Sequence, residues 1–177
     1  MLDGSMYVSI MFPRGNVQVF SIKSLLSHCR GYKDMDSIRI LTKNGEFVKV
    51  RDIQEIPVKS IGWKEIGYGQ DKFFRVYRDS LLITENRGTI KASELKVSDF
   101  LYRYNQDSIL SDDAIKVPYR LEAVTSIKDV PVEDMVKEPA YTIVTESGDF
   151  LANDFLTYGG VINGRERSAA GTEETDR

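Results

Sequence analysis

His28 and Cys29 are the only histidine and the only cysteine of the chain, and they are adjacent in sequence. A thiol beside an imidazole can act as a nucleophile with its base. The pair falls in residues 21–33, whose helical periodicity points adjacent side chains about 100° apart. We therefore expect a half-exposed His28 and a packed Cys29 instead of a catalytic pair. One histidine and one cysteine are too few ligands for zinc, and we expect no metal and no cofactor.

Asn163 is followed by Gly164, and this pair carries a different chemistry. Because glycine leaves the peptide nitrogen unhindered, Asn-Gly is prone to succinimide formation. An active site here could cleave the chain after Asn163 without a preceding histidine, since Ile162 occupies that position. The alternative, which we favour, is an ordinary turn that leads into a polar tail.

The overall composition is that of a globular protein. The chain has 177 residues, 41% of them hydrophobic and 29% charged, with a net charge of −3. Lysines and arginines are spread along the chain, which disfavours nucleic acid and membrane as partners. No apolar run is long enough to span a membrane. A single cysteine cannot form an internal disulfide, which is typical of a reducing compartment, and we expect a cytoplasmic protein.

The elements that must position any site are mostly short strands, predicted from alternating apolar and polar residues. Strands are expected at 6–12, 17–22, 37–42, 47–53, 72–77, 81–84, 89–95, 100–104, 119–130, 140–145, 149–153 and 155–158. The periodicity predicts one helix near 22–31, with Gly31 at its C-terminal cap. Asn44-Gly45 predicts a type I′ turn at 43–46. The sequence thus predicts an all-β domain over residues 1–163, with an exposed loop or small insertion at 105–119 and a disordered tail at 164–177.

A set of apolar residues in these elements is expected to form the core. They are Ile10, Phe20, Ile22, Leu25, Ile40, Val76, Leu82, Leu95, Phe100, Val124, Ile143, Phe150 and Leu156.

Two separated segments contain motifs that are more specific than composition or periodicity. Residues 79–102, DSLLITENRGTIKASELKVSDFLY, resemble a segment of the Hint superfamily, the fold shared by inteins and hedgehog autoprocessing domains. The family has an Ala-x-x-Leu-x-x-Gly-Asp run there; Ala92, Leu95 and Asp99 match it, and Ser98 replaces the glycine.

The second segment is AYTIVTESGDFLANDFLTYGG, residues 140–160, which is similar to the C-terminal segment of inteins. The matching residues are Tyr141, Phe150, Ala152, Asn153, Phe155 and Leu156. The start, MLDGSMYV, is similar more loosely, with Gly4 matching and Met1 at the place of the nucleophile. Alternatively, the start is a cloning remnant that ends in Gly4-Ser5, with the natural chain starting at Met6, and the match at Met1 then has no meaning.

The resemblance implies a Hint fold of two pseudo-two-fold β-subdomains whose chain ends meet centrally. On this basis the strands of 140–158 should pair with those of 6–22. The resemblance also implies chemistry: in the family a first Cys or Ser attacks the preceding carbonyl. A histidine, with a threonine nearby, polarises that amide. A terminal asparagine, helped by a histidine, then cyclises and cuts the downstream bond.

This chain departs from the family at each of these positions. Met1 stands for the nucleophile, Tyr77 for the threonine and Ser80 for the histidine. Tyr158 and Gly159 stand for the terminal His-Asn pair. A thioether cannot be deprotonated, and losing a positioned general acid or base costs roughly 10²–10⁴ in rate. The resemblance therefore predicts an intein-type domain with a degenerate site that does not splice by the standard route.

Two alternatives remain open at this point. One is an active single-turnover autoprocessing domain with altered chemistry, cleaving after Asn163 or using a missing partner segment. The other is a non-catalytic β-rich binding or structural module. For an intein-type domain, the implied partners are the flanking host (extein) segments or a complementary intein fragment.

The hypothesis of cleavage after Asn163 has a direct test. We expect the intact mass of the incubated protein to stay constant, as for an ordinary turn, and to match the behaviour of Asn163→Ala. Loss of the residues after Asn163 from the natural chain alone would establish the cleavage.

Overall fold

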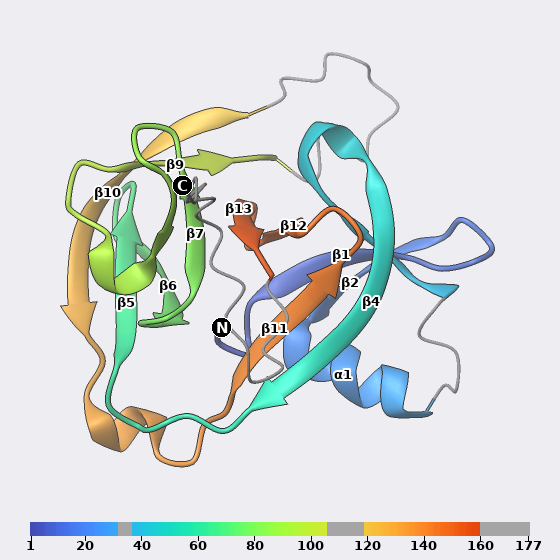
Figure 1. Ribbon diagram of the computed structural model, residues 1–177, viewed down its shortest axis with the longest axis horizontal. Helices are drawn as coiled ribbons and strands as arrows, with labels where there is room; N and C mark the ends of the chain where they lie inside the picture. The colour runs from blue at the N-terminus through green and yellow to red at the C-terminus, as the bar shows by residue number, and fades with distance from the viewer. Residues whose placement is uncertain (32–36, 106–118, 160–177) are drawn as a thin grey trace, which may run out of the picture.

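The described residues form two β-sheets and one α-helix, α1 (Ile22–Gly31). This is a computed structural model, and it describes residues 1–31, 37–105 and 119–159. Figure 1 shows α1 beside the sheet that contains β1 and β4. The expected all-β class with a short helix is confirmed. Of the expected loop at 105–119 only the two end residues are described, and the expected tail at 164–177 lies outside the described residues.

The first sheet is antiparallel throughout. Its strands, in spatial order, are β11 (Ala140–Thr145), β4 (Phe47–Ile56), β3 (Arg39–Leu41), β1 (Tyr7–Met11) and β2 (Val17–Ser21). The helix α1 follows β2 directly, and residues Ile22, Leu25, Leu26 and Cys29 form its buried face. These residues recur at the three- and four-residue spacing of one helix face, which is why this segment becomes a helix against the sheet.

The second sheet carries the later strands. Its order is β12 (Asp149–Ala152), β13 (Phe155–Tyr158), β7 (Leu81–Thr84), β9 (Phe100–Arg103), β10 (Arg120–Asp129), β5 (Trp63–Tyr68) and β6 (Lys72–Tyr77), with β8 (Gly88–Lys91) paired to β7. Short 3₁₀ helices occur at η2 (Lys43–Gly45), η3 (Ala92–Glu94) and η4 (Val132–Met135). Residues 92–94, expected as the end of a strand, belong to η3.

The core prediction is confirmed except at two positions. All the expected core residues are buried apart from Phe20, which is partly buried, and Phe100, which is 39% exposed. Successive side chains of a strand point to opposite faces, and in β9 the inward position belongs to the buried Leu101. The largest core cluster draws residues from both sheets, including Ile10, Ile143 and Phe150.

The turn between β3 and β4 differs from the prediction. Thr42 donates its backbone N–H to the Glu46 carbonyl at 2.8 Å, which leaves a three-residue loop formed by η2. Gly45, at φ 74°, takes the left-handed position that closes such a loop. The Asn-Gly signal located the hairpin correctly, but the loop is one residue longer than a type I′ turn.

The predicted pairing of 140–158 with 6–22 is also wrong. β11 pairs with β4 over Ala140–Thr145, and β12 pairs with β13. The two chain regions nevertheless touch. Asn153 donates its backbone N–H to the Tyr7 carbonyl at 3.0 Å, and the Tyr7 N–H donates to Asn153 Oδ1 at 2.8 Å. The contact is made by a turn and not by a strand ladder, so strand periodicity could not reveal it.

The loop before β9 is built around a buried carboxylate. Asp99 is 4% exposed and accepts hydrogen bonds from the Arg87 guanidinium, from Asn86 Nδ2 at 2.9 Å and from the Lys96 N–H at 2.8 Å. The Arg87 hydrogen bonds lower the pKa of Asp99 to about 2. The aspartate of the Ala-x-x-Leu run therefore anchors this loop.

Ser98, the residue before it, has a φ of 76°. This left-handed conformation suits glycine, the residue that the family has here, and costs another residue roughly 1–2 kcal/mol.

Ser98→Gly should therefore raise the free energy of unfolding by about 0.5–1 kcal/mol, the strain relieved less the greater chain entropy of glycine. Urea unfolding measures the change. Ser98→Ala, which keeps the strain, should give no such gain, and a loss of stability in Ser98→Gly would contradict the explanation.

Candidate functional site

The first residues of the chain lie between the two sheets. Leu2 bridges to Val76 of β6 and to Tyr141 of β11. Its N–H donates to the Tyr141 carbonyl at 2.7 Å, and the Tyr141 N–H donates to the Leu2 carbonyl at 2.9 Å. β6 and β11 are the last strands of their respective sheets, so this segment joins one sheet edge to the other. In Figure 1 the N-terminus accordingly lies in the middle of the molecule.

Three of the predicted site residues meet at this point. The Met1 amino nitrogen donates to Ser80 Oγ at 3.0 Å. The Tyr77 N–H donates to the Met1 carbonyl at 3.0 Å, and the Ser80 N–H donates to the Tyr77 carbonyl at 2.8 Å. The turn between β6 and β7 thus holds the backbone nitrogen of Met1 against the Ser80 hydroxyl, which is buried.

The Met1 amino group is buried. Burial lowers the pKa of this group to about 5, while the nearby Asp79 carboxylate acts in the opposite direction. The Met1 side chain packs against a cluster that contains Trp63 and Tyr77. With Met1 as the first residue, the amino group is therefore uncharged at neutral pH. Its neighbour Ser80 can donate or accept a hydrogen bond but carries no charge to offer.

The ring of Tyr77 lies edge-on to Trp63, with the ring centroids 5.7 Å apart. Tyr77 is buried, and it contributes to the site through its backbone.

The packing around position 4 explains why this residue is a glycine. A Cβ atom at this position would lie 2.6 Å from Cε2 of Tyr141 and 3.1 Å from Cβ of Lys23. The Tyr141 ring therefore occupies the space that a side chain at position 4 would need. The match between Gly4 and the family glycine has a packing reason.

Tyr158 and Gly159 lie at the end of β13, beside the same turn. Tyr158 pairs with Leu81, the residue after Ser80, and neighbouring strands lie about 4.8 Å apart. The Tyr158 ring packs over Gly148, where a Cβ would come within 2.7 Å of it. The strand pairing thus brings Tyr158 beside the residue that follows Ser80, but the tyrosine side chain packs on the turn before β12.

Gly159 leaves no room for a side chain in this conformation. A Cβ atom would lie 1.8 Å from the Ile143 carbonyl oxygen and 3.0 Å from Cε1 of Phe150. The Gly159 N–H donates to the Gly148 carbonyl at 2.8 Å, which fixes this close approach. Asparagine at position 159 therefore requires a different path of the backbone.

The turn between β12 and β13 is a second point where the ends of the chain meet. Asn153 and Asp154 have φ values of 48° and 70°, as the two central residues of a type I′ turn require. The Tyr7 hydroxyl donates to Asp154 Oδ2 at 2.9 Å, in addition to the backbone contacts with Asn153. Asn153 of the C-terminal motif is thus a turn residue, and this turn contacts Tyr7 of β1.

His28 lies elsewhere in the fold. It packs between Phe12 and Phe20, with ring centroids 5.6 and 5.4 Å away, and it is partly exposed, whereas Cys29 is buried. Both expectations for this pair are confirmed. Within residues 1–31, 37–105 and 119–159, no group of three or more His, Cys, Asp or Glu residues could hold a metal ion.

Sequence reasoning missed two residues near the site. The Asp79 carboxylate raises the pKa of the Met1 amino group. In the sequence, only its position beside Ser80 could have indicated this role. Tyr141 was matched as a motif residue, but its pairing with Leu2 depends on tertiary structure alone. Asn163 lies outside the described residues.

Comparison with solved structures identifies the fold. The Mvu mini-intein of transcription factor IIB superposes with a TM-score of 0.68 at 17% identity, over 89% of this chain and 98% of that one. An intein from a hyperthermophile gives 0.65 at 13% identity, over 89% and 98%. A DnaB intein from Synechocystis gives 0.63 at 15% identity, over 90% and 98%. No protein-family model and no curated protein matches the sequence.

These similarities establish that the chain has the Hint fold of inteins, as expected from residues 79–102 and 140–160. None of the helices in the described part of the chain has the length and apolarity of a membrane span.

The close packing at Gly159 leads to a prediction. Gly159→Asn should destabilise the protein by about 1–3 kcal/mol or more, because a buried clash with backbone cannot be relieved by rotating a side chain. Tyr158→His, at a partly exposed neighbouring position, should cost less. Thermal unfolding of the two variants compares them. Equal stability of Gly159→Asn and the natural chain would show that the backbone at this position is free to move.

Proposed function

We propose that this protein is an intein-type Hint domain with a degenerate site, which does not carry out standard splicing. The domain extends over residues 1–163, and its partners are flanking host segments or a complementary intein fragment. The proposal excludes nucleic acid and membrane as partners, and the expected location is the cytoplasm.

One observation carries the proposal. The backbone nitrogen of residue 1 lies 3.0 Å from the side chain of residue 80, on a Hint fold. In the family, the residues at these two positions are a nucleophile and a histidine that polarises the preceding peptide bond. Here the pair consists of a methionine and a serine.

The chemistry of the two side chains explains the expected inactivity. Splicing requires a nucleophile whose thiol or hydroxyl attacks the carbonyl carbon before it, so that the C–N bond breaks and the amine takes up a proton. The Met1 thioether has no proton to lose. Ser80, with a neutral hydroxyl, is a poor proton donor to the leaving amine at neutral pH.

The C-terminal half supports the same proposal. Tyr158 and Gly159 offer neither an imidazole nor a carboxamide, so the cyclisation that releases the downstream segment lacks its reacting group. The absence of room for a side chain at Gly159 adds support, because the backbone is packed against Ile143 where the family has asparagine.

The test fuses a soluble partner protein to each end of the chain. The natural sequence should give neither ligated partners nor cleavage products when incubated at neutral pH and analysed by mass spectrometry. Ligation of the two partners by the natural chain would refute the proposal.

Restoring only the N-terminal pair provides the matched positive variant. Met1→Cys with Ser80→His should form a thioester at the upstream junction, and an added thiol should then release the upstream partner. Each single change should release at least 10²-fold less, because one variant lacks the histidine and the other lacks the nucleophile. A folded double variant without thiol-dependent cleavage would argue that positions 1 and 80 do not correspond to the family's pair.

A further inference from the structure

Two connections that run from one sheet to the other meet beside Met1. Residues 57–62 join β4 to β5, and residues 130–139 join β10 to β11 (Figure 1). The Val130 N–H donates to the Trp63 carbonyl at 3.0 Å, which links the second connection to the start of β5. Both connections contribute to one apolar cluster, the Met1 cluster, which includes Met1, Val58, Trp63, Tyr77, Val130 and Met135.

Ile61 is an exposed apolar side chain next to the turn that holds Met1. It is 64% exposed, and it precedes Gly62, whose carbonyl accepts the Arg78 N–H at 2.9 Å. Arg78 follows Tyr77, which donates its own N–H to the Met1 carbonyl at 3.0 Å. The first connection therefore presents a large aliphatic group to solvent close to the first residue of the chain.

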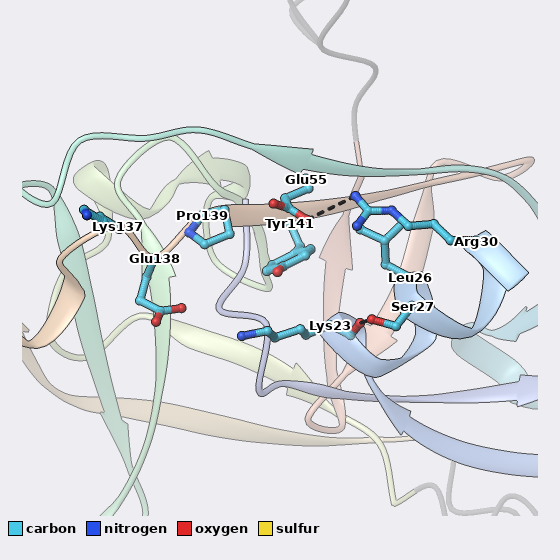
Figure 2. A pocket seen from close by; sticks show the side chains of 9 residues that line it. All are labelled: Lys23, Leu26, Ser27, Arg30, Glu55, Lys137, Glu138, Pro139 and Tyr141. Atoms are coloured by element: carbon cyan, nitrogen blue, oxygen red, sulfur yellow. Dashed lines mark hydrogen bonds and ion pairs between the residues drawn. The ribbon is translucent and has the colours of Figure 1, made fainter.

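The second connection is apolar at one end and charged at the other. Val132 and Val136 are 46% and 55% exposed, and they flank Met135, which is buried in the Met1 cluster. Residues 137–139, which follow, line an open pocket of about 220 Å³ together with Tyr141, and charges of both signs surround that pocket (Figure 2). An apolar segment that begins at Met1 is therefore matched by the valines and not by the pocket.

The burial of the Met1 nitrogen determines where a preceding residue must lie. The nitrogen is buried and donates to Ser80 Oγ at 3.0 Å. A residue joined to this nitrogen cannot begin in solvent, and it begins against the side chains that surround Met1. Because the Met1 side chain already packs against the Met1 cluster, the neighbouring apolar groups are the surface available to such a residue.

Trp63 offers a polar contact within the same cluster. Its side chain is fully buried, and Nε1 has no hydrogen-bond partner within the described residues. An indole nitrogen can only donate, and a buried N–H group normally has an acceptor. A polypeptide segment bound here brings backbone carbonyl groups, which can accept this hydrogen bond.

The charge nearest to the nitrogen disfavours an acidic segment. The Asp79 carboxylate raises the pKa of the Met1 amino group, which places a negative charge close to the point where a preceding residue is attached. Farther away, the connections carry charges of both signs, with Lys59 on the first and Glu133 and Asp134 on the second. An acidic side chain directly before Met1 would therefore be repelled by Asp79.

We propose that the surface formed by Ile61, Val132 and Val136 binds the host segment that precedes Met1, with an apolar side chain at the residue directly before Met1. The inference rests on the proposed function, because it takes the partner to be a flanking host segment. The covalent bond to the Met1 nitrogen brings that segment to this surface. Covering exposed aliphatic side chains that adjoin a buried cluster is favourable.

The experiment extends the natural chain at its N-terminus by Gly-Ser-Leu or by Gly-Ser-Asp and compares thermal unfolding. The leucine chain should have a midpoint roughly 2–4 °C higher than the aspartate chain, as expected for partial burial of one leucine in a protein of this size. Equal midpoints, or a higher midpoint for the aspartate chain, would overturn the proposal. Intact mass shows that the extension is still attached; its loss would count against the proposed function, whereas the midpoints decide on this surface.

Trp63 gives a second reading of the same two chains. It is the only tryptophan, so the ¹⁵N spectrum contains a single indole N–H signal. This signal should lie farther downfield in the leucine chain, where the segment supplies an acceptor, than in the aspartate chain. An identical indole signal in the two chains would also overturn the proposal.

Substitutions in the surface locate the contact. Ile61→Ser combined with Val136→Ser should reduce the difference between the two extended chains to less than about 1 °C. Val19→Ser is the matched control, because Val19 is 61% exposed on β2, and it should keep the full difference. A full difference in the double variant would overturn the proposal. Self-association of the unextended chain that the double variant loses would assign the surface to a second copy and would overturn it too.

Discussion

The architecture depends on backbone hydrogen bonds between the first residues of the chain and the edge strands of two sheets. β6 and β11 each end a sheet, and an open strand edge leaves N–H and C=O groups without partners. The backbone N–H and C=O groups of Leu2 both bond to those of Tyr141 in β11. The Met1 carbonyl accepts the N–H of Tyr77 in β6. Because these bonds use backbone atoms, they do not depend on the identity of the first side chain.

That independence explains how the geometry of the site can persist without its chemistry. The 3.0 Å approach of the Met1 nitrogen to Ser80 Oγ is set by the turn after β6, and the Tyr77 contribution also comes from its backbone. A change of side chain at position 1 or position 80 alters the reactivity of the pair while the main chain keeps its path. Gly159 is different, since its backbone is packed so closely against Ile143 that the residue type and the local path are linked.

Several motif residues are explained by the backbone conformation or the close packing at their positions. Asn153 and Asp154 both have positive φ, which lets the β12–β13 turn dock against Tyr7. Ser98 has a left-handed φ at the position where the family has glycine, immediately before the anchoring Asp99. Gly4 allows the Tyr141 ring to pass close to the chain. Several of the positions that carry the resemblance to the family therefore have special backbone or packing requirements.

The sequence by itself determined the class of fold, most strands, the helix and nearly the whole core, because a period of 2.0 or 3.6 residues is a local property of apolar side chains. It also located the two motif segments and the residues 1, 77, 80, 158 and 159. Only the tertiary structure decided which strands pair, as the error over 140–158 and 6–22 shows, because pairing depends on contacts between distant segments. It likewise decided that Leu2 joins the sheets, that Gly159 has no space for a side chain and that Tyr141 faces a pocket. Each of these features depends on atoms from several elements at once, so it cannot be predicted from the spacing of residues along the chain.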